Sequence, residues 1–180
     1  MNKVLCVDLD GTLINDDLLI KGITFIVKNK PYLLTACVFK LLLGKHRLKD
    51  YVASKVPINL LSYKYNQSVL NLLFDKRKHG YKVYLVSGAA IDYVRYFYFS
   101  NKHLFCNYYA SNQFNLVGIK KAHFLNLIFG VGGYEYVGNS KDDIPCFNSS
   151  SLAYCVLDKR NKDKILEKIL EKLLISYVRV

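Results

Sequence analysis

The stretch Leu5-Cys6-Val7-Asp8-Leu9-Asp10-Gly11-Thr12-Leu13 decides the fold that we predict for this chain. Its apolar beginning, together with Val4, has the length and composition of a short buried strand, and the Gly11 turn ends that strand. Asp8 and Asp10 are two residues apart at the strand end, so their side chains can lean to the same side. We therefore expect a pair of carboxylates at the carboxyl end of a strand.

Outward from this stretch, apolar runs alternate with helical patterns. We expect further strands over residues 81–86, 105–110, 134–137 and 152–157, and half of a small hairpin over residues 114–117. Such alternation predicts an α/β fold with a doubly wound, mostly parallel sheet. In that fold, ligands bind beyond the carboxyl ends of the strands.

Residues 14–67 are too many for one crossover between strands, and their pattern is helical and basic. We predict a core over residues 1–13 and 68–157, a small inserted helical cap over 14–67, and an amphipathic C-terminal helix over 158–180.

The composition limits the class of protein. The chain has 180 residues with 26 basic and 14 acidic side chains, which gives a formal net charge of +12. Its five cysteines show no CxxC spacing, so we expect reduced thiols and a cytoplasmic protein. We see no signal peptide and no stretch of about 20 apolar residues that would span a membrane. Peripheral contact with the inner membrane face remains open.

The positive charge is concentrated. Between Lys21 and Lys55 there are eight basic residues and one acid, Asp50. Such an excess favours anionic partners, either phosphorylated substrates or acidic lipid, although coding bias toward lysine would produce it too. Nucleic acid is disfavoured as a partner because the sequence has no zinc-ligand spacing, arginine cluster or RNA-binding aromatic signature.

Four polar segments follow the expected order of a known family. They are Asp8-Leu9-Asp10-Gly11-Thr12, Ser87-Gly88, Gly118-Ile119-Lys120-Lys121 and Gly138-Asn139-Ser140-Lys141-Asp142-Asp143. Over roughly residues 3–157 the chain resembles haloacid dehalogenase (HAD) superfamily phosphohydrolases. The resemblance implies that the predicted core is HAD-like and that the inserted cap is of the C1 type. More narrowly, residues 5–13 and 136–143 resemble the HAD domain fused to UbiA-type prenyltransferases.

The resemblance implies roles for the first two segments. Asp8 would attack phosphorus and form an aspartyl-phosphate, and Asp10 would protonate the leaving alkoxide and then activate water. A second acid at position 10 points to a phosphatase or phosphomutase rather than a dehalogenase. Gly11 and Thr12 would contribute to substrate binding. The Ser87 hydroxyl and the Gly88 amide would bind a phosphoryl oxygen.

The other two segments would supply a cation and a metal site. Lys121, or its neighbour Lys120, would neutralise the nucleophile and the phosphoryl group, and only one of the two can face the site. Magnesium would bind the Asp8 carboxylate, the Asp10 carbonyl, Asn139 and Asp143, the last directly or through water, with Asp142 as the alternative to Asp143. Asn139 stands where the family usually has an aspartate, which predicts weaker metal binding.

These inferences converge on a Mg²⁺-dependent phosphomonoesterase. The basic cap favours a polyprenyl-linked or other lipid-associated sugar phosphate, and a small metabolite such as phosphoserine is the alternative substrate. A third alternative is a weakly active or inactive HAD scaffold that binds a membrane prenyltransferase.

Overall fold

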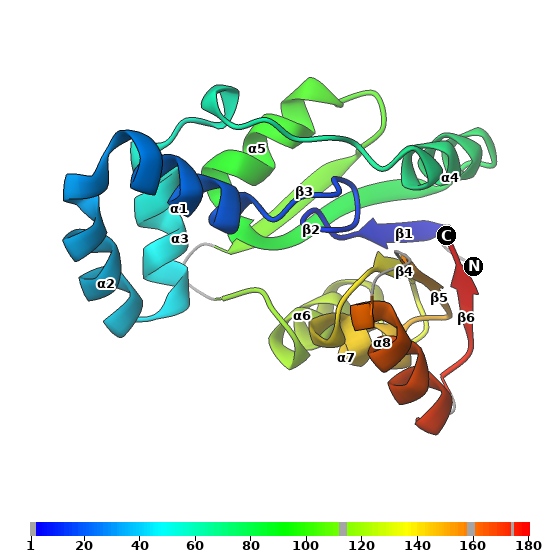
Figure 1. Cartoon of the computed structure of the whole chain (residues 1–180). Helices are drawn as coiled ribbons and strands as arrows, with labels where there is room; N and C mark the ends of the chain where they lie inside the picture. The colour runs from blue at the N-terminus through cyan, green and yellow to red at the C-terminus, as the bar shows by residue number, and fades with distance from the viewer. Residues whose placement is uncertain (1–2, 112–114, 158–160, 174) are drawn as a thin grey trace.

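A computed structural model describes residues 3–111, 115–157, 161–173 and 175–180 of the chain (Figure 1). Six strands form one sheet in the order β3-β2-β1-β4-β5-β6, and every neighbouring pair is parallel. The strands are β1 (Val4–Val7), β2 (Lys82–Ala90), β3 (Asn107–Ser111), β4 (Glu135–Gly138), β5 (Leu152–Cys155) and β6 (Tyr177–Arg179).

Helices cover both faces of this sheet. They are α1 (Leu18–Asn29), α2 (Leu34–Leu42), α3 (Lys45–Lys55), α4 (Gln67–Lys78), α5 (Ile91–Ser100), α6 (Ile119–Phe129), α7 (Ile144–Ser149) and α8 (Asn161–Lys172). Figure 1 shows α4 and α5 on one face, and α6, α7 and α8 on the other. The parallel sheet between two helical layers is a doubly wound, Rossmann-like α/β fold, which confirms the predicted fold class.

The residues of β1 explain its central position. Leu5 and Val7 belong to the buried cluster that contains the inward side chains of α4 and α5, whereas Val4 and Cys6 belong to the cluster with α6 and α7. Successive strand residues point to opposite faces, so a strand buried on both faces is apolar throughout. The first polar residue, Asp8, therefore comes where the strand leaves the core.

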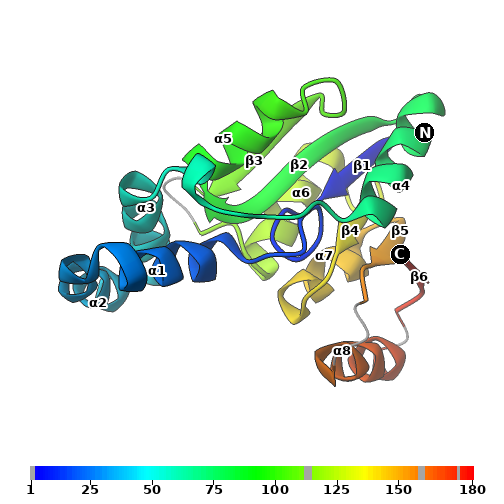
Figure 2. The ribbon, with the colours of Figure 1, turned by 45° about the horizontal axis from the view of Figure 1, so that its top comes forward.

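Three helices occupy the segment predicted as a cap. Asp17 begins α1 by accepting a hydrogen bond from the Ile20 amide (2.9 Å). Gly44, with φ of 122°, separates α2 from α3. The Tyr93 hydroxyl of α5 donates to the Val56 carbonyl at the end of α3 (2.6 Å) and ties this segment to the core. Figure 2 shows α1, α2 and α3 grouped beside the sheet.

The C-terminal region differs from the prediction. The tail was predicted to be an amphipathic helix throughout, but α8 is followed by β6, which adds a sixth strand to the sheet. The predicted boundary at residue 158 lies outside the described residues, as does residue 114 of the predicted hairpin, and residues 115–117 form no strand. Among the helices that the structure describes, none has the length and hydropathy needed to cross a bilayer.

Candidate active site

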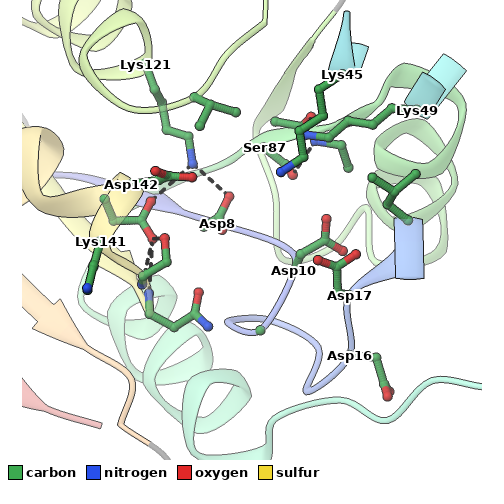
Figure 3. A pocket seen from close by; sticks show the side chains of 18 of the residues that line it. Asp8, Asp10, Asp16, Asp17, Lys45, Lys49, Ser87, Lys121, Lys141 and Asp142 are labelled. Atoms are coloured by element: carbon green, nitrogen blue, oxygen red, sulfur yellow. Dashed lines mark hydrogen bonds and ion pairs between the residues drawn. The ribbon is translucent and has the colours of Figure 1, made fainter. Parts of the chain in front are cut away.

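The two aspartates of the first motif lie in a turn directly after β1. The Leu13 amide donates to the Asp8 carbonyl (3.3 Å), which folds the chain back after the strand. The Asp10 carboxylate accepts a hydrogen bond from the Leu18 amide (3.1 Å) at the beginning of α1. Both side chains line one cavity of about 700 Å³ between the sheet edge and the cap (Figure 3).

Lys121 reaches Asp8 from the first turn of α6. Its ammonium lies 2.9 Å from a carboxylate oxygen of Asp8 and 3.2 Å from one of Asp143, and it is almost fully buried. Burial disfavours the charged form, but the two carboxylates more than offset this, so the pKa of Lys121 is raised. Lys120, the alternative at the sequence level, is exposed.

Asp143 holds this cation and a loop at once. One carboxylate oxygen accepts from Lys121 and from the Tyr136 hydroxyl (2.7 Å). The other oxygen accepts hydrogen bonds from the backbone amides of Asn139 (3.2 Å) and Ser140 (3.1 Å). It also accepts one from the Ser140 hydroxyl (2.9 Å). Burial alone would raise the pKa of Asp143, but Lys121 and these donors hold it below its usual value. Asp143 therefore stays ionised and orients Lys121.

Asn139 joins the loop after β4 to the loop after β1. Its side-chain oxygen accepts a hydrogen bond from the Thr12 hydroxyl (3.1 Å). A Cβ atom on Gly11 would lie 2.1 Å from the side-chain amide nitrogen of Asn139, which leaves no room for a side chain. Gly11 also has φ of 70°, a backbone conformation that favours glycine. Thr12 is fully buried and does not line the cavity, and its hydroxyl positions Asn139; its predicted contact with substrate stays a prediction.

Ser87 and Gly88 lie within β2 rather than after it, where the pairing with β3 shifts register. The Ser87 oxygen accepts from the Ala89 amide (3.0 Å), and Ser87 and Gly88 both line the cavity. A Cβ atom on Gly88 would lie 2.4 Å from a methyl group of Val117, so the loop before α6 packs directly on this backbone. The second motif thus reaches the same cavity as Asp8.

Burial and neighbouring charges raise the pKa of both carboxyl groups of the first motif. Burial raises the pKa of Asp10 to about 7, with Asp8 and Asp17 adding to the shift. Burial also raises the pKa of Asp8 to about 6, while Lys121 opposes the shift and Asp143 adds to it. An acid with a pKa near 7 can donate and accept a proton at physiological pH, which is the property that a general acid and base needs.

The cap contributes two cations that we did not predict from the sequence. Lys45 and Lys49 are four residues apart on α3 and both line the cavity (Figure 3). The Lys49 ammonium donates to the Gly88 carbonyl (2.6 Å). Burial lowers the pKa of Lys49, Lys45 lowers it further, and Asp10 opposes both. The excess of basic residues in this segment was visible, but periodicity alone could not show which of them face the cavity.

The predicted magnesium ligands can be tested against this geometry. Asp8, Asp10 and Asn139 present oxygen donors around one cavity, and oxygen is the donor that Mg²⁺ prefers. The raised pKa values of the two aspartates indicate an excess of buried negative charge that a cation would relieve. Asp143 already has both oxygens engaged, which favours contact through water, and Asp142 is exposed at the rim.

The donor set nevertheless differs from a site built of side-chain acids. Within the described residues, no group of three or more His, Cys, Asp or Glu side chains is placed to hold a metal ion. The predicted set instead includes an amide oxygen and a backbone carbonyl. With two carboxylates in addition, its chemistry fits Mg²⁺. Tyr136, which bonds to both Lys121 and Asp143, carried no signal in the sequence because it reads as a core strand residue.

Comparison with known proteins now gives an independent view of the fold. No protein-family model matches the chain, and no curated protein matches it in sequence. Solved structures do match. An HAD family hydrolase from Salmonella enterica has 13% identity and a TM-score of 0.62, and the match covers 89% of this chain and 64% of that one. A phosphoserine phosphatase, solved as an analogue of its phospho-aspartyl intermediate, has 16% identity and a TM-score of 0.62, with 93% and 90% covered.

Two further solved structures also match the chain. A protein of unknown function from Bordetella pertussis has 11% identity and a TM-score of 0.70, and the match covers 99% of both chains. The cobalt-bound deoxy-D-mannose-octulosonate 8-phosphate phosphatase from Haemophilus influenzae has 14% identity and a TM-score of 0.54, covering 98% of this chain and 77% of that one. All four share the fold of this chain. Identity this low establishes the fold and not the activity.

Proposed function

We propose that this protein is a phosphoric monoester hydrolase that works through an aspartyl-phosphate intermediate and depends on Mg²⁺. The observation that carries the proposal is the pairing of Asp8 with the buried Lys121 at 2.9 Å, beside an Asp10 whose pKa is raised to about 7. The shared fold with HAD phosphatases, among them one that forms a phospho-aspartyl intermediate, supports the same reading.

In the first step, a carboxylate oxygen of Asp8 attacks phosphorus, and the bond from phosphorus to the leaving alkoxide breaks. Asp10, protonated near neutral pH, gives its proton to that alkoxide. Lys121 offsets the repulsion between the Asp8 carboxylate and the phosphoryl group, and the Ser87 hydroxyl with the Gly88 amide supports a phosphoryl oxygen. The products of this step are the free alcohol and phosphorylated Asp8.

In the second step, water attacks the same phosphorus. Asp10, now ionised, accepts a proton from that water, and the bond between phosphorus and Asp8 breaks. Inorganic phosphate leaves and both aspartates return to their starting states. When bound by Asp8, the Asp10 carbonyl, Asn139 and, through water, Asp143, Mg²⁺ would add positive charge beside the phosphoryl oxygens.

The proposal is tested by assaying a generic aryl phosphate with and without Mg²⁺. Asp8→Asn removes the nucleophile, and we expect turnover to fall by at least about 10³-fold. Asp75→Asn, on the exposed surface of α4, is the matched control and should leave turnover unchanged. An active Asp8→Asn variant would contradict the proposed intermediate, and so would failure of beryllofluoride to bind Asp8 in the parent protein.

The substrate class follows from the cap. Lys45 and Lys49 face Asp10 across the cavity, where the leaving part of a phosphomonoester would lie, and they favour a leaving part with its own anionic group. Both substrate classes predicted from the sequence meet this condition, namely a small metabolite such as phosphoserine and a lipid-linked sugar phosphate. Turnover of phosphoserine and of a polyprenyl-linked sugar phosphate, compared at equal concentration, distinguishes them.

One observation favours a second candidate function. The side-chain oxygen of Asn139 is already bonded to Thr12, so a predicted metal ligand is both neutral and engaged. A weakly active or inactive scaffold that binds a membrane prenyltransferase would tolerate this, and the narrower resemblance to UbiA-fused domains is the basis for that partner. Absence of turnover in the parent protein across pH and divalent metals would favour this scaffold over the hydrolase.

A further inference from the structure

The outer face of α2 has an unusual distribution of side chains. Val38, Phe39 and Leu42 lie on one side of the helix and are 60%, 59% and 80% exposed, whereas Cys37 is buried against the rest of the cap. A surface helix normally presents its polar side to solvent. Here the solvent side is apolar, and we call Val38, Phe39 and Leu42 the α2 apolar face.

More apolar residues extend this face beyond the helix. Tyr32, just before α2, and Leu43, just after it, are both exposed, as is Leu41 within it. Figures 1 and 2 both show α2 at the end of the molecule farthest from β6, with no other element beyond it. The apolar residues therefore belong to a helix at the periphery of the molecule. Contiguous exposed apolar surface of this kind marks an interaction site.

Each of the three helices of this segment carries a basic residue. Lys28 is exposed near the end of α1, Lys40 lies within α2, and Arg47 is exposed at the beginning of α3. Among the described residues, none of the three lies within ion-pair distance of an acidic side chain, although Asp50 is close enough to Arg47 to interact with it electrostatically. An exposed apolar helix face in a segment rich in lysine and arginine is typical of helices that lie in the interface of an anionic bilayer.

We propose that the α2 apolar face docks the protein on the surface of an anionic lipid bilayer. Phe39 and Leu42 would enter the boundary between headgroups and acyl chains, while Lys28, Lys40 and Arg47 would contact lipid phosphates. A second copy of the chain fits this face less well. Pairing two copies through α2 would bring together two segments, residues 21–55 of each copy, that each have a net charge of +7. The proposal is independent of the proposed enzymatic activity.

The chain offers a clean spectroscopic test because it contains no tryptophan. Leu42→Trp places a single reporter on the α2 apolar face. Leu127→Trp is the matched control, since Leu127 is 74% exposed on α6, a different part of the surface. With vesicles that contain roughly one-third anionic phosphatidylglycerol, we expect a blue-shifted emission for Leu42→Trp, quenching by brominated lipid, and no change for Leu127→Trp. Purely zwitterionic vesicles should have little effect.

A second measurement addresses the energetic contribution of the face. In vesicle flotation, the double variant Phe39→Gln with Leu42→Gln should bind anionic vesicles at least about tenfold more weakly. The double variant Leu127→Gln with Val131→Gln, which changes two other highly exposed apolar residues, should bind like the parent. Thermal unfolding of both variants verifies that each one folds.

Three results would overturn the proposal. The first is an unchanged Leu42→Trp emission on addition of anionic vesicles. The second is equal vesicle binding by the parent and the Phe39→Gln, Leu42→Gln variant. The third is a dimer in solution that this variant dissociates while the parent fails to bind vesicles, which would assign the face to a second copy. Because aryl phosphate turnover is measured separately, loss of docking and loss of catalysis are distinguishable.

Discussion

The two walls of the cavity hold their lysines in different ways. On the core wall, Lys121 is buried and contacts Asp8, Asp143 and the Tyr136 hydroxyl within 3.2 Å. On the cap wall, Lys49 has a bond of 2.6 Å to the Gly88 carbonyl, and Lys45 is exposed at the cavity edge. Lys121 is held in place by its ion pairs with two carboxylates. Lys49 could leave the Gly88 carbonyl to bind a ligand, and the exposed Lys45 could bind one directly.

This contrast separates two tasks. A cation fixed between two carboxylates is preorganised for a charge that always appears at the same place, as in attack on phosphorus. A cation that contacts a neutral carbonyl and not a carboxylate, as Lys49 does, suits a charged ligand group that arrives with the substrate and leaves with the product. If this assignment is right, changes on the core wall should affect the chemical step, and changes on the cap wall should affect substrate binding.

The largest effect is expected for Lys121→Met. Removing the cation leaves Asp8 and Asp143 buried beside each other without compensation, so we expect a loss of roughly 3–5 kcal/mol in the free energy of unfolding. Turnover of aryl phosphate should fall by about 10³-fold. Urea denaturation and steady-state kinetics measure the two. Lys120→Met, one residue away and exposed, should change neither, and equal effects of both variants would remove the distinction between them.

Asp10→Asn should reduce turnover by about 10²-fold or more, because the leaving alkoxide loses its proton donor. In metal-free protein the same variant should change the dependence of stability on pH. The pKa of Asp10 is raised to about 7, so its contribution to stability is complete below the unfolded pKa and is lost as pH rises through 7.

Between about pH 4 and pH 8, the parent protein should therefore lose roughly 2–4 kcal/mol more stability than Asp10→Asn. Urea denaturation in the presence of a chelator measures this difference. Parallel stability profiles for the two proteins would show that Asp10 is ionised at all these pH values and has no proton to donate.

Asn139→Asp tests the metal-binding side of the core wall. Adding a carboxylate should strengthen Mg²⁺ binding, so half-maximal activation should need about tenfold less Mg²⁺. Asn59→Asp, on an exposed residue after α3, controls for the change in net charge. Unchanged or poorer activation of Asn139→Asp would contradict the predicted ligand role of this position.

The smallest effect is expected on the cap wall. Lys49→Met should raise KM for a phosphomonoester with an anionic leaving group by several-fold and leave kcat for a neutral aryl phosphate nearly unchanged. Lys55→Met, on the exposed end of the same helix, should alter neither constant. A fall in kcat for the neutral substrate with Lys49→Met would assign this lysine to the chemical step and remove the contrast between the walls.

Much of the fold was predictable because local signals agreed with the final packing. The apolar run before Asp8 forms β1. Asn66 begins α4 by accepting hydrogen bonds from the backbone amides of Ser68 and Val69, as asparagine commonly does at the start of a helix. β6 was missed because Tyr177–Arg179 is only three residues long and mostly exposed at the sheet edge. So short a segment has no detectable periodicity, and its pairing with β5 is a tertiary effect.

The site was predictable where a motif fixed both spacing and chemistry, and less so elsewhere. Asp8, Asp10, Ser87 and Lys121 meet at one cavity, as the order of the motifs implied. Thr12 belongs to the motif, but the motif alone did not show that its hydroxyl bonds to Asn139. That contact depends on how the loop after β4 packs against the loop after β1. The cap lysines and Tyr136 lie on elements whose rotation about their axes depends on packing that no short segment encodes.

The bonds made by Asp143 have a consequence for how the protein would fail. The carboxylate that anchors the loop after β4 also aims the lysine at Asp8, so loosening of that loop releases both together. Gentle heating or a mild denaturant should therefore abolish turnover while the sheet and its helices remain folded. Loss of function would then be an early, local and reversible event, well separated from global melting.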